Sequence, residues 1–210
     1  MPLMHFTDRH FVRLLATETR RSDTSPRALA NSHVALGRFL AGELIDHLPV
    51  EPCDIAHPQG VRQGWRIADE LRIALLVFMR AGLYVAEGVR EVLHHAPMQH
   101  VNPQRGVGLA EVELAVLNAR APSVCVLIDA VVNTGASLEP VLAQLATRGA
   151  RLFVLSLVTP VVTAERLERS WPGVSFLFAR VSENQYVGKG ATDTGDRLFG
   201  IVPNAERQSS

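Results

Sequence analysis

The sequence predicts an α/β protein built on a parallel β-sheet with helices on both faces. Three apolar runs of strand length lie at residues 73–79, 124–128 and 152–158, and their lack of polar alternation is typical of strands buried on both faces. Helical patterns lie between these runs, and one of them places its apolar residues on a single stripe: Leu138, Val141, Leu142, Leu145 and Ala146. Strands that alternate with helices along a chain are usually joined in parallel.

Composition limits the class of protein. The chain has 210 residues, of which 47% are hydrophobic, so it can bury a full core, and its length favours a single domain. Its 21 basic and 21 acidic residues balance, which argues against nucleic acid as a partner. Cys125 lies inside an apolar run, far from Cys53, so we expect reduced thiols and a reducing compartment.

The sequence gives no sign of targeting or of a membrane span. Residues 1–20 carry several charges and lack the apolar core of a signal peptide. No apolar run approaches the ~20 residues that a membrane helix needs. We therefore expect a cytoplasmic protein without a membrane partner.

Residues 1–55 show a helical pattern that is broken once. The break lies at 20–26, where Pro26 after Thr24 or Ser25 marks the start of a second helix. We expect this arm to contain little sheet, and the proline-rich stretch 49–60 to be a linker. Apolar residues recur at helical spacing on both sides of the break: Phe11, Leu14, Leu15, Val34, Leu36, Phe39, Leu40 and Leu44.

From about residue 67 onward, strands and helices alternate. Val112, Leu114 and Val116 alternate with other residues, which predicts a partly exposed strand. Gly149 is typical of the position after a helix, so the helix that follows the central run ends there. In order, we expect strands at 73–79, 99–105, 110–117, 124–128, 152–158 and 174–181, helices at 83–94, 138–148 and 163–170, and a loop at 182–201.

The carboxyl ends of these strands are the expected place for a site, because ligands of parallel sheets bind there. Three segments meet at this edge of the predicted fold: 80–82, 129–137 and 182–200. Asp129 follows the central apolar run, and the small residues Asn133-Thr-Gly-Ala-Ser137 precede a helix. Helix N-termini offer free N–H groups and a positive dipole end to anions. A carboxylate beside such a loop indicates a site for a phosphorylated sugar.

Other kinds of site are excluded or less favoured. The P-loop pattern is absent, and Gly188-Lys-Gly190 does not continue as a dinucleotide-binding fingerprint. His94, His95 and His100 have no second cluster at metal-ligand spacing. Ser137 lacks the Gly-x-Ser-x-Gly context of a serine nucleophile.

Three charged residues have alternative interpretations. Arg80 either ends its strand as a surface charge or grips an anion, which Gly82 would allow to approach closely. Asp193 and Asp196 are either turn-formers or part of the site, and the local pattern does not decide between them.

Three motifs follow the order and nearly the spacing of one known family: Met79-Arg-Ala-Gly-Leu83, Leu127-Ile-Asp-Ala-Val-Val-Asn-Thr-Gly-Ala-Ser137 and Tyr186-Val-Gly-Lys-Gly-Ala-Thr-Asp-Thr-Gly-Asp-Arg-Leu-Phe-Gly200. Residues 37–49 also look like that family's N-terminal helix. On these motifs the chain resembles uracil phosphoribosyltransferases from end to end. The resemblance implies a type I phosphoribosyltransferase fold over residues 1–210: a parallel-sheet core (67–181) with helices on both faces, under a small hood made by the helical arm (1–55) and a base-binding segment (182–210).

The resemblance also implies substrates and residue roles. The enzyme would move the phosphoribosyl group of phosphoribosyl pyrophosphate (PRPP), with Mg²⁺, to a pyrimidine base in pyrimidine salvage. Asp129 and Asp193 match the family's catalytic carboxylates, and no residue matches a direct metal ligand, so Mg²⁺ would be bound through PRPP. The implied PRPP-binding residues are Arg80, Arg105, Asp129, Asn133, Thr134, Gly135, Ala136, Ser137 and Asp193. The implied base-binding residues are Val187, Thr192, Asp193 and Thr194.

The sequence departs from the family pattern mainly in the base-binding segment. Thr192 replaces a glycine whose bare backbone approaches the base, and Lys189 stands where the family has a different residue. Ala136 replaces a glycine in the 129–137 loop. Uracil is the first choice of acceptor, and the alternatives are another base or heterocycle, or a non-catalytic regulator that binds PRPP or a nucleotide. By resemblance we expect a homodimer or homotetramer.

Overall fold

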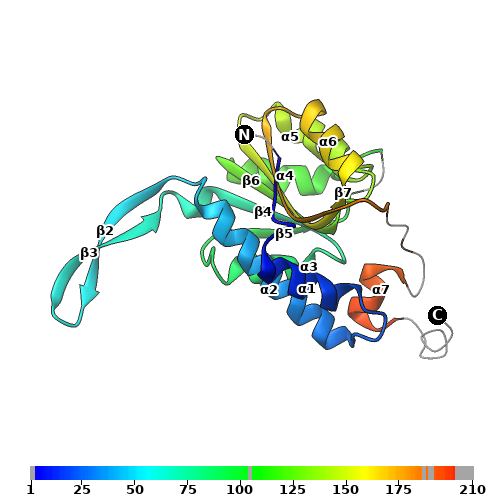
Figure 1. The fold of residues 1–210 in the computed structure, drawn as a ribbon. Helices are drawn as coiled ribbons and strands as arrows, with labels where there is room; N and C mark the ends of the chain where they lie inside the picture. The colour runs from blue at the N-terminus through cyan, green and yellow to red at the C-terminus, as the bar shows by residue number, and fades with distance from the viewer. Residues whose placement is uncertain (1–2, 104–105, 186–187, 189–191, 202–210) are drawn as a thin grey trace.

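The centre of the molecule is a six-stranded parallel sheet (Figure 1). The computed structural model describes residues 3–103, 106–185, 188 and 192–201. The strand order is β1-β8-β7-β6-β4-β5, and every neighbouring pair is parallel, which confirms the predicted architecture. The strands of this sheet are β1 (Met4–His5), β4 (Ile73–Phe78), β5 (Met98–Val101), β6 (Val124–Val131), β7 (Arg151–Pro160) and β8 (Val174–Ser182).

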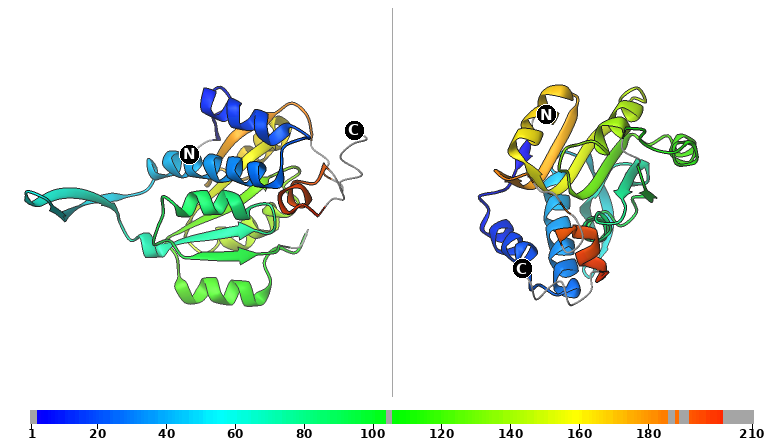
Figure 2. Two further views of the ribbon diagram at one scale, coloured as in Figure 1. Left: turned by 90° about the horizontal axis from the view of Figure 1, so that it is seen from below. Right: turned by 90° about the vertical axis from the view of Figure 1, so that its right-hand side faces the viewer.

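Helices cover both faces because successive residues of each buried strand point into two separate cores. Val77 and Ile128 pack with α1, α2 and α3, whereas Leu76 and Leu127 pack with α4, α5 and α6. The helices on the two faces of the sheet can be followed in Figure 2. Within the described part of the chain, no helix has both the length and the apolar character needed to cross a membrane. The helices are α1 (His10–Arg20), α2 (Pro26–Ile45), the 3-10 turn η1 (Glu70–Arg72), α3 (Leu83–Arg90), α4 (Glu111–Arg120), α5 (Leu138–Ala146), α6 (Val161–Ser170) and α7 (Thr194–Phe199).

Glycines let α2 and α3 pack at backbone distance. A Cβ added to Gly88 would overlap the carbonyl oxygen of Val34, and one added to Gly37 would overlap that of Val85. Helix α2 begins as predicted at Pro26, and Ser25 caps it by accepting a hydrogen bond from the N–H of Ala28 at 3.2 Å. Helix α7 packs against this close pair of helices.

Helices from the N-terminal and C-terminal parts of the chain form a hood, which we define as α1, the first turns of α2, and α7. Leu198 of α7 is buried against Leu29 and Ala30 of α2. Arg197 of α7 donates hydrogen bonds to the carbonyl oxygens of Thr19 (3.0 Å) and Arg21 (2.7 Å). These bonds join residues 178 and 176 positions apart in the sequence. The hood therefore brings α1, α2 and α7 beside the carboxyl ends of the strands.

The predicted strand at 110–117 is wrong, because these residues lie mostly in α4. Glu113 stabilises the helix start, since its carboxylate accepts hydrogen bonds from the N–H groups of Ala110 (2.7 Å) and Asn102 (3.0 Å). Val112 and Val116 lie in this helix with 70% and 45% of their surface exposed. Their alternation with other residues resembled the pattern of a strand, but these side chains do not form a buried face.

The predicted linker at 49–60 is also wrong. It contains β2 (Val50–His57), which pairs with β3 (Gly60–Ile67) in an antiparallel hairpin that projects from the sheet (Figure 1). Most residues of the hairpin are exposed on both faces. Its sequence therefore lacks the alternation of apolar and polar residues that marks a strand with one buried face.

Several element ends differ from the prediction. Strand β6 continues to Val131, so Asp129 lies within the strand instead of after it. Helix α3 ends at Arg90, four residues before the predicted end. The predicted loop at 182–201 contains α7, and the N-terminal arm contributes the short edge strand β1.

Candidate active site

Two neighbouring strands, β4 and β6, bring Arg80 and Asp129 to one edge of the sheet. Strand β4 pairs with β6 up to the residues Val77 and Ile128. The turn after β4 lies tightly against this pair, because a Cβ on Gly82 would come 2.6 Å from the carbonyl oxygens of both Phe78 and Ile128. Glycine at position 82 therefore sets the turn that carries Arg80 next to the end of β6.

Asp129 is a carboxylate without a cationic partner among the described residues. It pairs in register with Ser156 of β7, and its Oδ1 accepts a long hydrogen bond, 3.4 Å, from the N–H of Val131. Part of the residue's surface remains exposed, but its carboxyl group is enclosed by protein, and this burial raises its pKa to about 7. A buried, unpaired carboxylate at a sheet edge is available to a ligand.

The 133–137 loop links β6 to α5 and is held in place by α6. Gly135 has φ +78°, which disfavours any residue with a Cβ, and its carbonyl oxygen accepts the N–H groups of Leu138 (2.9 Å) and Glu139 (2.8 Å). Arg166 donates to the carbonyl oxygen of Thr134 at 2.7 Å and to Oε1 of Glu139 at 2.8 Å. The loop is thus fixed before any ligand arrives.

The groups that this loop leaves free suit an anion. The N–H groups of Gly135 and Ser137 have no acceptor in the described part of the chain, and the hydroxyl of Ser137 does not cap α5. The exposed Thr134 adds a second hydroxyl, and the carbonyl oxygen of Ala136 accepts a 3.4 Å hydrogen bond from Gly106. Free N–H groups at the start of a helix bind anions.

Asn133 is the first residue of this loop. Its carbonyl oxygen accepts a hydrogen bond from the hydroxyl of Thr163 at 2.7 Å. Its side-chain Oδ1 is buried without a donor among the described residues, and a ligand donor or cation would satisfy it.

The start of α7 reaches the same edge. Arg80 forms an ion pair with Asp196, with Nη2 2.7 Å from Oδ1, so sequence reasoning missed a direct link between the two segments. Asp193 caps α7 by accepting the N–H of Asp196 at 2.9 Å. Thr194 is the first residue of α7, and Thr192 is exposed.

Two predicted site residues cannot be placed. Arg105 and Val187 lie outside the described residues, as does Lys189. Among the predicted residues that are described, Arg80, Asp129, residues 133–137 and residues 192–194 belong to the turns and element ends at this side of the sheet.

A cavity of about 270 Å³ lies between the hood and the ends of β6, β7 and β8. We call it the hood cavity. Thr194 and Arg197 line it from α7, Val131 from β6 and Arg180 from β8. Sequence reasoning did not single out Arg180 or Arg197, because nothing local separates them from other surface arginines.

This arrangement defines a class of enzyme. The six-stranded parallel sheet with helices on both faces is the fold of type I phosphoribosyltransferases, and its carboxyl edge carries the unpaired Asp129 and a loop with free N–H groups. A family model described as uracil phosphoribosyltransferase matches residues 6–201. The chain therefore belongs to the uracil phosphoribosyltransferase family, and it is an enzyme of the pentosyltransferase kind.

Individual relatives agree with this assignment at low identity. The uracil phosphoribosyltransferase of Thermococcus gammatolerans is 27% identical over 213 residues, covering 96% of this chain and 95% of the relative. That of Ralstonia pickettii is 28% identical and covers 88% of each chain. The solved structure of the AQ2163 protein from Aquifex aeolicus is similar in fold, with a TM-score of 0.75, 20% identity, and coverage of 95% of this chain and 99% of that one.

Proposed function

We propose that the protein transfers the 5-phosphoribosyl group of PRPP to a pyrimidine base, with uracil as the first choice, giving UMP and pyrophosphate. One observation carries the proposal: the unpartnered Asp129 carboxylate lies on the strand that leads into the anion-binding 133–137 loop, with Arg80 on the neighbouring turn. In PRPP, a ribose carries a phosphate at one end and a pyrophosphate at the other. The loop matches the 5′-phosphate, Asp129 matches the ribose, and Arg80 matches the pyrophosphate.

Each part of PRPP has a partner in this proposal. The 133–137 loop receives the 5′-phosphate through its free N–H groups and the hydroxyls of Thr134 and Ser137. Asp129 accepts hydrogen bonds from the ribose hydroxyls, and Arg80 binds the pyrophosphate. On family resemblance, Arg105 is assigned to the pyrophosphate, and the base is assigned to Val187, Thr192, Asp193 and Thr194.

The proposed reaction breaks the bond between C1 of the ribose and the pyrophosphate oxygen, and forms a bond from a ring nitrogen of the base to C1. The base loses its N–H proton to solvent. Positive charge develops on the sugar and negative charge on the departing pyrophosphate. Asp129 stabilises the sugar, Arg80 stabilises the leaving group, and the fixed 133–137 loop holds the sugar in line for attack.

Mg²⁺ fits the donors at this edge. Asp129 and Asp193 offer carboxylate oxygens, the ligand type that Mg²⁺ prefers, and Mg²⁺ usually keeps most of its ligands as water and substrate phosphate. Bound with PRPP, Mg²⁺ would neutralise charge on the pyrophosphate. We place it on PRPP, without a dedicated set of protein ligands.

We also propose a homodimer or homotetramer in which the β2–β3 hairpin packs against a second copy of the chain. Val61 and Trp65, which lie on one face of this hairpin, have 67% and 69% of their surface exposed, and Ile55, on the other face, has 43%. An isolated two-stranded hairpin is marginally stable in water, and exposed apolar clusters mark interaction surfaces. A second copy would cover these side chains and support the hairpin.

The acceptor is tested with a panel of bases scored by pyrophosphate release in the presence of PRPP and Mg²⁺. We expect release with uracil and none without a base. Release with another heterocycle but not with uracil would replace uracil as the acceptor, an alternative that the exposed Thr192 in the base-binding segment favours. Stabilisation by PRPP without turnover of any base would contradict catalysis and favour a regulator.

A further inference from the structure

The hood cavity has walls that suit a small flat molecule. Its volume is about 270 Å³, and it opens beside Thr194, which is assigned to the base in the proposed function. Its walls are largely apolar, and the apolar side chains come from α1, α2 and the strand ends: Val12, Ala16, Leu29, Leu36, Leu157 and Ala179. An apolar slot with a few polar groups at one side is the usual form of a ligand pocket.

Three arginines line this cavity: Arg20 at the end of α1, Arg180 on β8 and Arg197 on α7. Arg20 and Arg197 are held by backbone carbonyl oxygens, with Arg20 Nε donating to Ala16 at 3.0 Å. Arg180 has no hydrogen bond or ion pair with any described residue. Its partial burial and the nearby positive charge of Arg20 lower its pKa. Such a half-buried guanidinium is unfavourable without a negative partner.

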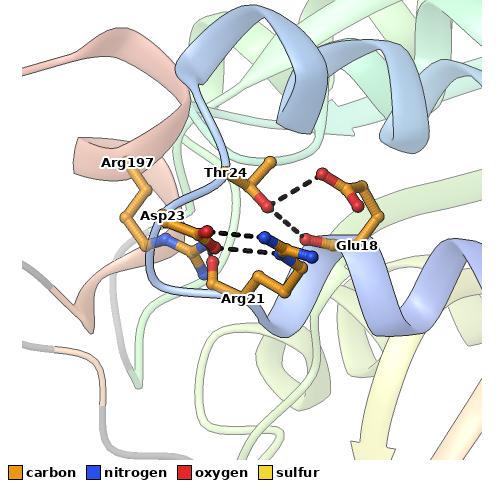
Figure 3. Close-up of polar contacts among 5 residues, drawn as sticks. All are labelled: Glu18, Arg21, Asp23, Thr24 and Arg197. Atoms are coloured by element: carbon orange, nitrogen blue, oxygen red, sulfur yellow. Dashed lines mark hydrogen bonds and ion pairs between the residues drawn. The ribbon is translucent and has the colours of Figure 1, made fainter.

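The acidic residues near the hood are engaged elsewhere (Figure 3). Asp23 forms an ion pair with Arg21, with Oδ2 2.6 Å from Nη2. The hydroxyl of Thr24 lies 2.7 Å from the carbonyl oxygen of Glu18 and 3.0 Å from its Oε1. Neither carboxylate lines the hood cavity, and no aspartate or glutamate is found among the described residues that do.

His33 does not change this balance of charge. It is buried in the cavity wall, and burial lowers its pKa to about 4. Its Nδ1–H donates to the carbonyl oxygen of Leu29 at 2.8 Å, because that oxygen can only accept. The ring is therefore neutral near pH 7, and the cavity keeps the net positive charge of its arginines.

We infer that the hood cavity binds a small planar carboxylate, with its ring against the apolar wall and its carboxylate on the guanidinium of Arg180, supported by Arg20. Guanidinium groups pair with carboxylates through two parallel hydrogen bonds. Asn184 and Gln185 line the same cavity and carry amide groups that can donate to and accept from ring atoms. The ligand is either the acceptor base itself, which rests on the proposed function, or a regulator that binds beside it.

The test compares two molecules that differ only in the carboxylate: uracil and uracil-6-carboxylate. Isothermal titration calorimetry without PRPP measures their affinities for the wild-type protein and for Arg180→Gln, with Arg27→Gln as control. Arg27 is an exposed hood arginine outside the cavity. We expect uracil-6-carboxylate to bind wild type and Arg27→Gln at least about tenfold more tightly than uracil, and Arg180→Gln to lose this preference.

Thermal denaturation separates a binding defect from a folding defect. Because Arg180 has no partner to lose among the described residues, Arg180→Gln should melt at the wild-type temperature or above it. Equal affinities of the wild type for the two ligands, or an unchanged preference in Arg180→Gln, would overturn the inference.

A second measurement assigns the ligand's role without affecting the binding result. Uracil-6-carboxylate is added with PRPP and Mg²⁺, and pyrophosphate release is followed. Release shows that the cavity holds the acceptor. Binding without release, together with a changed rate for uracil, shows that it holds a regulator, and both results retain the anion site. If no base supports transfer, the proposed function fails while the calorimetric comparison still decides the anion site.

Discussion

Replacing Asp129 by asparagine should make the protein more stable and less active. Burial raises the pKa of Asp129 from an ordinary 3.8 to about 7, and at 1.36 kcal/mol for each tenfold change in proton affinity this rise corresponds to ~4 kcal/mol. Part of the residue's surface remains exposed, and solvent weakens such effects, so we expect about half of that value. An asparagine side chain cannot ionise, so the variant escapes this cost.

The sign of the effect depends on pH. The folded protein holds the Asp129 proton more tightly than the unfolded chain, so its stabilising contribution is complete below pH 3.8 and is lost as the pH rises through about 7. The stability gain of Asp129→Asn should therefore be ~2 kcal/mol near pH 8 and close to zero near pH 4. Urea denaturation followed by circular dichroism measures both values.

Turnover should move in the opposite direction. Without the carboxylate, the ribose hydroxyls and the developing positive charge lose their partner, so we expect kcat to fall on the order of 100-fold or more. Wild-type affinity for PRPP should also weaken as the pH falls below about 7, because the protonated carboxyl group no longer attracts the ribose hydroxyls or Mg²⁺. Equal stability gains near pH 4 and pH 8 would refute the burial argument. Near-normal turnover would refute the role given to Asp129.

Three further predictions concern other parts of the molecule. Arg80→Gln should lower kcat/KM about 100-fold with little effect on melting, whereas Asp196→Asn removes the same ion pair but keeps the guanidinium and should retain most activity; equal losses in steady-state assays would contradict the role of Arg80. Gly88→Ala should destabilise the protein by ~2 kcal/mol in urea, because its Cβ overlaps a carbonyl oxygen of α2, whereas Gly42→Ala, with nothing within 4 Å, should stabilise it by up to ~1 kcal/mol. If the two variants unfold alike, the close-packing argument is wrong. Trp65→Glu should lower the molar mass in light scattering without changing the circular dichroism spectrum, and an unchanged mass would exclude the hairpin as the interface.

The parallel sheet was predictable because its strands are buried on both faces. Residues 73–78 and 124–128 are entirely buried, and burial of this kind leaves uninterrupted apolar runs in the sequence. The hairpin was not predictable on this basis, because neither of its faces packs against the core. Helix α4 was misread for a related reason: of its described residues only Leu117 is buried, so its sequence has no apolar stripe to mark a helix.

Helix α7 had local signals that were available. Asp193 stands at the N-cap, and Gly200 follows the helix with φ +64°, which is the usual arrangement of residues around a helix. The many small and polar residues of the segment favoured the prediction of a loop instead. In contrast, no local pattern could have revealed the ion pair of Arg80 with Asp196, because it joins residues 116 positions apart.

The candidate site likewise has one part that the sequence reveals and one part that only the fold reveals. The 133–137 loop and Asp129 are close together in sequence, so their chemistry was visible from residue types alone. The hood cavity is formed by α1, α2, α7 and three strand ends, and its positive charge depends on which acidic residues are engaged elsewhere. Only the folded chain defines that property.

The most direct test of the proposed function is to measure UMP and pyrophosphate together. Purified protein is incubated with PRPP, Mg²⁺ and labelled uracil, and both products are quantified over time. We predict equimolar UMP and pyrophosphate at a rate proportional to enzyme, with Asp129→Asn on the order of 100-fold slower. The absence of UMP while PRPP still binds, or pyrophosphate release that does not depend on uracil, would contradict transfer to uracil.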